Sequence, residues 1–159
     1  MTQNKLCACR YFVLVSVTLL LASLLQLGCR GAKHRAEYIS KGDKMIIAVE
    51  IVPKHTFLAE YDRFAILVVN GKEVVRSKLF PDSGGYASSN LYRCSPMLYM
   101  LQGYFDTWVV DVNAGTITEG KCQSSNPEYV GIFEGGGSRS WNFYSSSERK
   151  EMKLEPKGG

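Results

Sequence analysis

The sequence contains only two histidines, His34 and His55, and it lacks the common catalytic and nucleotide-binding motifs. No P-loop, glycine-rich dinucleotide fingerprint, HExxH or GxSxG sequence occurs, and no CxxC pair follows the first 28 residues. A hydrolase would have to use His55, which has no motif around it. We therefore expect no enzymatic activity, no metal and no cofactor.

An excess of one charge is also missing once the first 28 residues are set aside. They hold two of the 19 basic residues and none of the 15 acidic ones, so the rest carries 17 basic and 15 acidic residues. A nucleic-acid-binding domain gathers a clear basic excess on one face. The only basic clusters are Arg30, Lys33 and Arg35 near the leader and Arg149, Lys150, Lys153 and Lys157 near the C-terminus. We expect no nucleic acid partner.

The first 28 residues have the features of an export signal. Lys5 and Arg10 give a cationic start with no acid, and residues 11–27 form an uncharged apolar run. This run is short for a membrane-spanning helix, which needs roughly 20 residues. Gly28 and Cys29 follow it directly, and a polar stretch comes next.

Leu27-Gly28-Cys29 resembles the lipobox of bacterial lipoproteins, in which a glycine precedes a cysteine that receives diacylglycerol. The resemblance covers the leader alone, and Gln26 and Leu27 depart from the family pattern. It implies a signal peptide over 1–28 that is cleaved before Cys29, and a membrane anchor made by the lipid on Cys29.

An uncleaved signal anchor, with Cys29 an ordinary thiol, is the alternative. More basic residues follow the apolar run than precede it, which argues against a simple anchor with a cytoplasmic N-terminus. Enterobacterial sorting retains lipoproteins with Asp after the lipidated cysteine in the inner membrane, whereas here Arg30 follows. By that resemblance, we expect the cell envelope and, in a Gram-negative cell, the outer membrane facing the periplasm.

The cysteines agree with export. Cys7 and Cys9 belong to the leader and Cys29 is assigned to the lipid, which leaves Cys94 and Cys122. Two thiols in an oxidising compartment predict a disulfide. The alternatives are two buried free thiols or a zinc site, and the scarcity of histidine argues against zinc.

The pattern from residue 44 to about 145 is that of β-strands. The runs at 45–52, 64–69, 72–80, 104–112 and 116–119 are rich in β-branched and aromatic residues, and shorter runs follow in 91–100 and 129–145. Asn70-Gly71 predicts a hairpin with a two-residue loop that pairs Leu67 with Val74. Residues 113–115 predict a second hairpin with a three-residue loop, capped by Asp111.

These runs predict an all-β fold, a small antiparallel barrel or sandwich of about seven to eight strands. The expected organisation is a signal peptide over 1–28, a lipidated tether over 29–43, a β domain over 44–145 and a polar tail over 146–159.

Two stretches rich in glycine and serine suggest recognition loops. Tyr86 lies in the loop 81–90, and Trp141 follows the segment 135–140, in which Arg139 supplies a cation. Small flexible residues beside an aromatic or arginine anchor are typical of binding loops. The alternative is that the glycines serve turns and the aromatic side chains cover the core.

Ser83-Gly84-Gly85-Tyr86 is similar to a loop of the membrane-bound lysozyme inhibitors of Gram-negative bacteria, small lipid-anchored β-barrels with one disulfide. That family plugs an enzyme cleft with a Ser-Gly-x-x-Tyr loop. Here the loop is one residue shorter, and the family's second Lys-Gly motif is not evident. The resemblance implies binding through Ser83, Gly84 and Tyr86.

We therefore expect a membrane-anchored envelope lipoprotein that binds a protein partner without catalysis, as an inhibitor or an immunity protein does. The alternative is a structural or assembly lipoprotein of the envelope.

Overall fold

The computed structural model describes residues 33–40, 42, 44–55, 58, 60–85, 87–135 and 141–154. The leader and the predicted lipidation site Cys29 lie outside this range, as do Tyr86 and Arg139. Within it, no helix has the length and hydropathy needed to cross a membrane.

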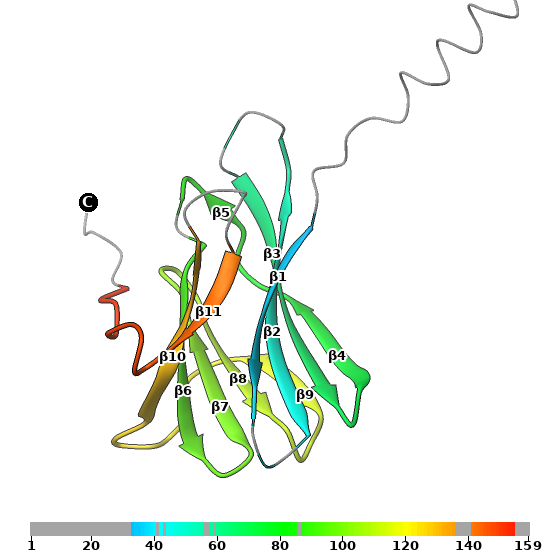
Figure 1. Ribbon diagram of the computed structural model, residues 1–159, viewed down its shortest axis with the longest axis vertical. Coiled ribbons are helices and arrows are strands. Elements are labelled where there is room, and N and C mark those ends of the chain that lie inside the picture. The colour runs from blue at the N-terminus through cyan, green and yellow to red at the C-terminus, as the bar shows by residue number, and fades with distance from the viewer. Residues whose placement is uncertain are drawn as a thin grey trace, which may run out of the picture. The chain divides into compact units, whose positions relative to one another are not determined.

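The described part forms two antiparallel sheets (Figure 1). Sheet A has the order β1-β2-β3-β4, and β5 pairs with the start of β3. Its strands are β1 His34–Ile39, β2 Met45–Pro53, β3 Glu60–Val69, β4 Lys72–Lys78 and β5 Asp82–Ser83. Sheet B has the order β11-β10-β6-β7-β8-β9. Its strands are β6 Ser89–Ser95, β7 Leu98–Gln102, β8 Thr107–Asp111, β9 Thr116–Glu119, β10 Glu128–Gly135 and β11 Trp141–Ser145.

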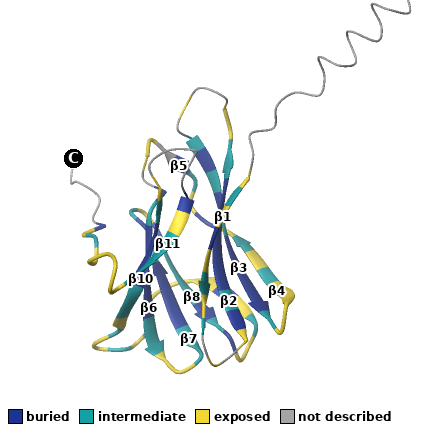
Figure 2. Cartoon of the chain, in the orientation of Figure 1, coloured by how far each residue is buried: buried dark blue, intermediate teal, exposed yellow. Residues whose placement is uncertain are grey.

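The two sheets face each other across one hydrophobic core. Alternate residues of a strand point to opposite faces, so every second side chain of the central strands enters this core. Buried side chains from both sheets meet there, among them Ile47, Val49 and Leu67 of sheet A and Leu91, Leu101, Val110 and Phe133 of sheet B. Along the sides, β1 lies beside β11 and β4 lies beside β9. Figure 2 shows the resulting concentration of buried residues along the central strands.

The strands of the two sheets run between two opposite ends of the described domain, a proximal and a distal end. The proximal end is where β1 begins, β2 ends and β6 begins, so it carries the β2–β3 connection, the loop 81–88 and the turn 103–106. The distal end carries the turns at 70–71, 96–97 and 112–115. Figure 1 shows the β6–β7 turn at the lower end and the start of β1 above it.

The expected all-β, antiparallel fold is confirmed, and of the two expected arrangements, barrel or sandwich, the described residues form two facing sheets. The strands remain in two separate sheets among the described residues and do not close into a barrel. Eleven strands are described, not seven or eight. The additional strands include β1, which lies inside the predicted tether 29–43. Its alternation places Ala36 and Tyr38 against the core, and the strand pairs with β2 along its whole length.

The predicted polar tail also needs correction. Residues 146–154 pack on the outer face of sheet B, where the amide of Asn90 donates to the carbonyl of Met152 at 2.7 Å. The hydroxyl of Tyr92 donates to Glu151 at 2.7 Å, and Leu154 is buried. This segment therefore covers part of a sheet face that would otherwise be exposed.

The hairpin at Asn70-Gly71 is confirmed, with φ of 52° and 77° at its two turn residues. Its register is different from the predicted one, because a bulge shifts the pairing between Leu67 and Val68. Leu67 consequently faces Val75, and Val74 is an exposed side chain.

The second hairpin is also present, with β8 and β9 joined by residues 112–115. The carboxylate of Asp111 accepts a bond from the amide of Ala114 at 2.9 Å, as predicted for a capping residue. Because Asp111 pairs with Thr116, the loop has four residues and not three.

Candidate binding surfaces

A buried ion pair joins the two sheets at the proximal end. Arg63 of β3 and Asp106 of the β7–β8 turn have side chains only 2% and 3% exposed, with Nη1 3.4 Å from Oδ1. Alternation along β3 explains the position of Arg63, since it lies on the same face as Tyr61 and Ala65. Burial lowers the pKa of the Arg63 guanidinium, and Asp106 opposes that shift.

Further hydrogen bonds of this pair hold both stems of the loop 81–88. Arg63 donates through Nη1 to the carbonyl of Phe80 at 3.2 Å and through Nη2 to the hydroxyl of Ser89. Asp106 accepts the amide of Phe80 at 2.9 Å and the indole N–H of Trp108 at 2.8 Å. Phe80 and Ser89, which flank the loop on its two sides, are therefore both bonded to the same buried ion pair.

Gly103 makes room for this cluster. A Cβ at this position would collide with Oδ1 of Asp106 and with the guanidinium of Arg63. The turn 103–106 closes with a bond from the amide of Gly103 to the carbonyl of Asp106 at 2.9 Å. The small residue therefore lets the turn carry Asp106 into the core.

The loop predicted to bind a partner lies at the proximal end. Ser83 belongs to β5, and Gly84 and Gly85 are exposed. The amide of Gly84 donates to Oδ1 of the buried Asp82 at 3.1 Å. Tyr86, the predicted anchor of this loop, lies outside the described residues.

Trp141 is not an exposed anchor, and that prediction is wrong. Its side chain is 7% exposed, belongs to the shared core and donates its indole N–H to the carbonyl of Val49 at 2.8 Å. Trp141 is the first residue of β11 and shares the inward face with Phe143. The period-two alternation of the predicted strand could have identified this burial. Arg139, the predicted cation beside Trp141, lies outside the described residues.

Exposed aromatic rings flank the loop 81–88. Phe80 precedes it and Phe105 lies in the turn 103–106, and their ring centroids are 5.7 Å apart. Both side chains are 49% exposed. The Arg63–Asp106 pair holds the backbone of Phe80 directly, and Phe105 is the chain neighbour of Asp106.

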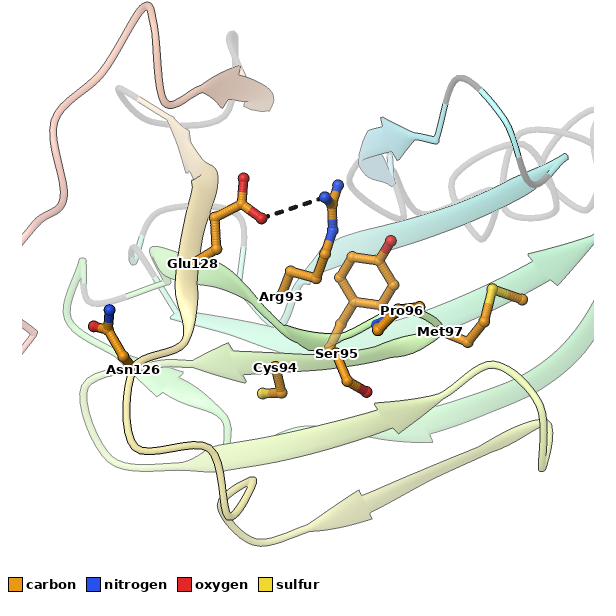
Figure 3. A pocket seen from close by; sticks show the side chains of 8 residues that line it. Arg93, Cys94, Ser95, Pro96, Met97, Asn126 and Glu128 are labelled. Atoms are coloured by element: carbon orange, nitrogen blue, oxygen red, sulfur yellow. Dashed lines mark hydrogen bonds and ion pairs between the residues drawn. The ribbon is translucent and has the colours of Figure 1, made fainter.

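A second surface lies at the distal end, where a shallow hollow of about 430 Å³ opens beside the β6–β7 turn (Figure 3). It is lined by Arg93, Cys94, Ser95, Pro96, Met97, Tyr99, Asn126 and Glu128. No sequence motif marks this site, because its residues come from two separate segments, 93–99 and 126–128.

Arg93 is the most constrained polar group of this hollow. Its guanidinium lies 3.3 Å from Glu128, donates to the hydroxyl of Tyr38 at 3.3 Å and lies over the ring of Tyr99. The bond to Tyr38 raises the pKa of Arg93 above its usual value. Strands β1, β7 and β10 thus hold one partly exposed arginine in place.

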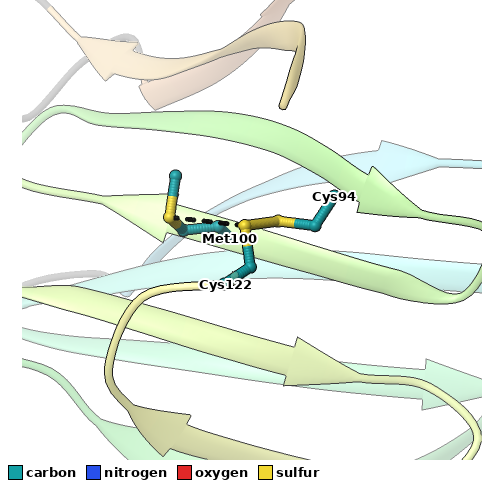
Figure 4. Close-up of a disulfide and its surroundings, with 3 residues drawn as sticks. All are labelled: Cys94, Met100 and Cys122. Atoms are coloured by element: carbon teal, nitrogen blue, oxygen red, sulfur yellow. Dashed lines mark hydrogen bonds between the residues drawn. A yellow bond between two sulfur atoms is a disulfide. The ribbon is translucent and has the colours of Figure 1, made fainter. Parts of the chain in front are cut away.

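The predicted disulfide between Cys94 and Cys122 is present, with the two Cα atoms 6.3 Å apart. It ties the end of β6 to the connection between β9 and β10, which supplies Asn126 to the hollow. The sulfur of Met100 lies 4.0 Å from that of Cys122 (Figure 4). The covalent link thus fixes one wall of the hollow.

His55 lies on the surface, 3.4 Å from the carboxylate of Glu60. The described residues include no group of three or more His, Cys, Asp or Glu side chains placed to hold a metal ion. Comparison with known proteins found no matching family model, no similar curated protein and no similar solved structure.

Proposed function

We propose that this chain is a membrane-anchored, non-enzymatic module that binds a protein partner at the bacterial cell envelope. The anchor is the lipid on Cys29, and the partner class is an enzyme or a toxin, as for an inhibitor or an immunity protein. The observation that carries the proposal is the distal hollow with Arg93 held in its wall by Tyr38, Glu128 and Tyr99.

The composition of the hollow supports a protein partner. Arginine, tyrosine and methionine are enriched in protein interfaces, and all three line it. An arginine that is already held by its neighbours loses little conformational entropy on binding. Asn126 and Pro96 add exposed polar and apolar groups at the rim.

The position of the hollow supports the same proposal. It lies at the end of the molecule opposite to the start of β1, so an anchor at the N-terminus leaves it accessible. Strand β6 has seven residues, which separates the two ends by about 23 Å at the usual rise of a strand.

The experiment is site-specific photo-crosslinking in living cells, with the full-length protein in its membrane. A photoreactive amino acid replaces Asn126 at the distal hollow or Gly84 in the loop 81–88. Replacement of the exposed Thr118 on β9 is the matched control. We expect one protein to be crosslinked from position 126 and not from 118, and Arg93→Met to reduce that product.

Other outcomes contradict the proposal in recognisable ways. Crosslinking from position 84 alone would assign binding to the loop that includes Ser83, Gly84 and Tyr86. Equal crosslinking of several proteins from all three positions would favour the alternative, an assembly lipoprotein embedded in a complex. A product at 126 that survives Arg93→Met unchanged would remove Arg93 from the interface.

A further inference from the structure

Three exposed large apolar side chains lie at the proximal end, and two of them are in contact with each other. Five such side chains are exposed in the described part of the chain. Leu58, Phe80 and Phe105, which are 58%, 49% and 49% exposed, lie at the proximal end. Ile39 and Val74, which are 61% and 48% exposed, lie toward the distal end of sheet A. The three proximal side chains come from separate connections, and two of them are aromatic.

The chain joins its leader at this same end. β1 begins at His34, so only residues 30–33 separate it from Cys29. The five Cα–Cα steps from Cys29 to His34 span at most about 18 Å. The predicted tether over 29–43 would have reached about 50 Å. An uncleaved anchor that ends at Leu27 would give a reach of about 25 Å, so either form of the leader keeps the proximal end near the bilayer.

We propose that the proximal end rests on the lipid bilayer, with Leu58, Phe80 and Phe105 in its interfacial layer. The inference rests on the membrane anchorage of the proposed function. Phenylalanine and leucine side chains on a membrane-facing surface enter the boundary between headgroups and acyl chains, while their polar neighbours stay hydrated. The bilayer is the occupant because the anchor already holds it within reach of these residues.

The charges around this end fit a neutral lipid surface. Lys54 and Lys78 both lie beside Asp62, at 3.7 and 3.0 Å. His55 lies beside Glu60 at 3.4 Å. Basic and acidic groups are therefore interspersed, and the contact depends on apolar side chains and not on anionic headgroups. It persists in zwitterionic vesicles and at high salt.

The Arg63–Asp106 pair gives this surface its rigidity. It fixes the backbone of Phe80 directly, and Asp106 is the chain neighbour of Phe105. The two rings therefore meet the membrane as one preformed unit. With this end on the bilayer, the distal hollow points away from the membrane, toward soluble partners.

Tryptophan quenching by brominated lipids tests the contact in the full-length, anchored protein. Phe105→Trp and Phe80→Trp place a reporter at the proximal end, and Val74→Trp is the matched control at the other end. Vesicles of phosphatidylcholine with brominated acyl chains quench only indoles that enter the bilayer. Trp108 and Trp141 are common to all variants, so the wild type supplies their background.

We expect fluorescence loss and a shift to shorter wavelength at positions 80 and 105, and only wild-type quenching at position 74. Quenching at 105 that is no greater than at 74 would overturn the inference. So would loss of the quenching at high salt, which would indicate a headgroup contact. Co-flotation of each variant with the vesicles checks the anchorage independently, so a failed anchor is distinguished from a failed contact.

Discussion

At the scale of single residues, the buried pair Arg63 and Asp106 is the feature with the largest expected effect on stability. Each charge has been removed from water, and each is balanced by the other and by neutral donors or acceptors. Removal of one member leaves the other buried without its counter-charge. The free-energy cost of that unpaired charge is larger than the net stabilisation that the intact pair provides. The first prediction concerns this asymmetry.

Asp106→Ala is expected to lower the free energy of unfolding by about 3–5 kcal/mol, since Arg63 stays buried and Phe80 and Trp108 lose their acceptor. Asp111→Ala on the surface is the matched control, with an expected loss of about 1 kcal/mol. The measurement is urea denaturation with the disulfide intact. The double variant Arg63→Met/Asp106→Leu should lose less than the sum of its single changes. Equal losses for Asp106→Ala and Asp111→Ala would refute this account.

At the scale of elements, the strands were largely predictable and their pairing partners were not. The runs at 45–52 and 64–69 correspond to β2 and β3, because β-branched residues fill the central strands of a buried sheet. The segment of β1 was assigned to the tether because charged residues alternate with Ala36 and Tyr38, which gives the segment a polar composition. β3 begins four residues earlier than predicted, and that extension contains Arg63.

The disulfide is the strongest link between elements that the sequence predicted. It closes a separation of 28 residues between Cys94 and Cys122. The double variant Cys94→Ser/Cys122→Ser is expected to lose about 3 kcal/mol of unfolding free energy, because the unfolded chain regains the freedom that the link removes.

The check is denaturation of both proteins with and without reductant. The wild type should fall to the stability of the variant when reduced, while the variant should not respond. A wild type that is unaffected by full reduction would show that the link adds no stability.

At the scale of the whole molecule, the proposed bilayer contact and the proposed partner site lie at opposite ends of the two-sheet domain. β1 begins at the proximal end, where Leu58, Phe80 and Phe105 are exposed, and the hollow around Arg93 opens at the distal end. The proposed function and the bilayer contact both depend on an anchor at the N-terminus.

Cys29→Ser is expected to release the protein from membranes or to leave an unprocessed precursor, because the lipid can no longer be attached. Fractionation of cells and the mass of the mature protein measure the two results. Cys7→Ser in the leader is the matched control and should change neither. Unchanged membrane association and mass for Cys29→Ser would identify the leader as an uncleaved anchor.

The sequence by itself determined the all-β class, the hairpin turn at Asn70-Gly71 and the disulfide, because each depends on local composition or on the count of cysteines. The tertiary structure decided which polar groups are buried and which distant segments meet. Asp106 had the sequence context of a turn residue, and only the facing sheet supplies Arg63 and makes it a buried partner. Trp141 had the context of a loop anchor, and only the core explains its burial. The hollow around Arg93 likewise exists only where three strands and a disulfide meet, since contacts between distant segments leave no local pattern in the chain.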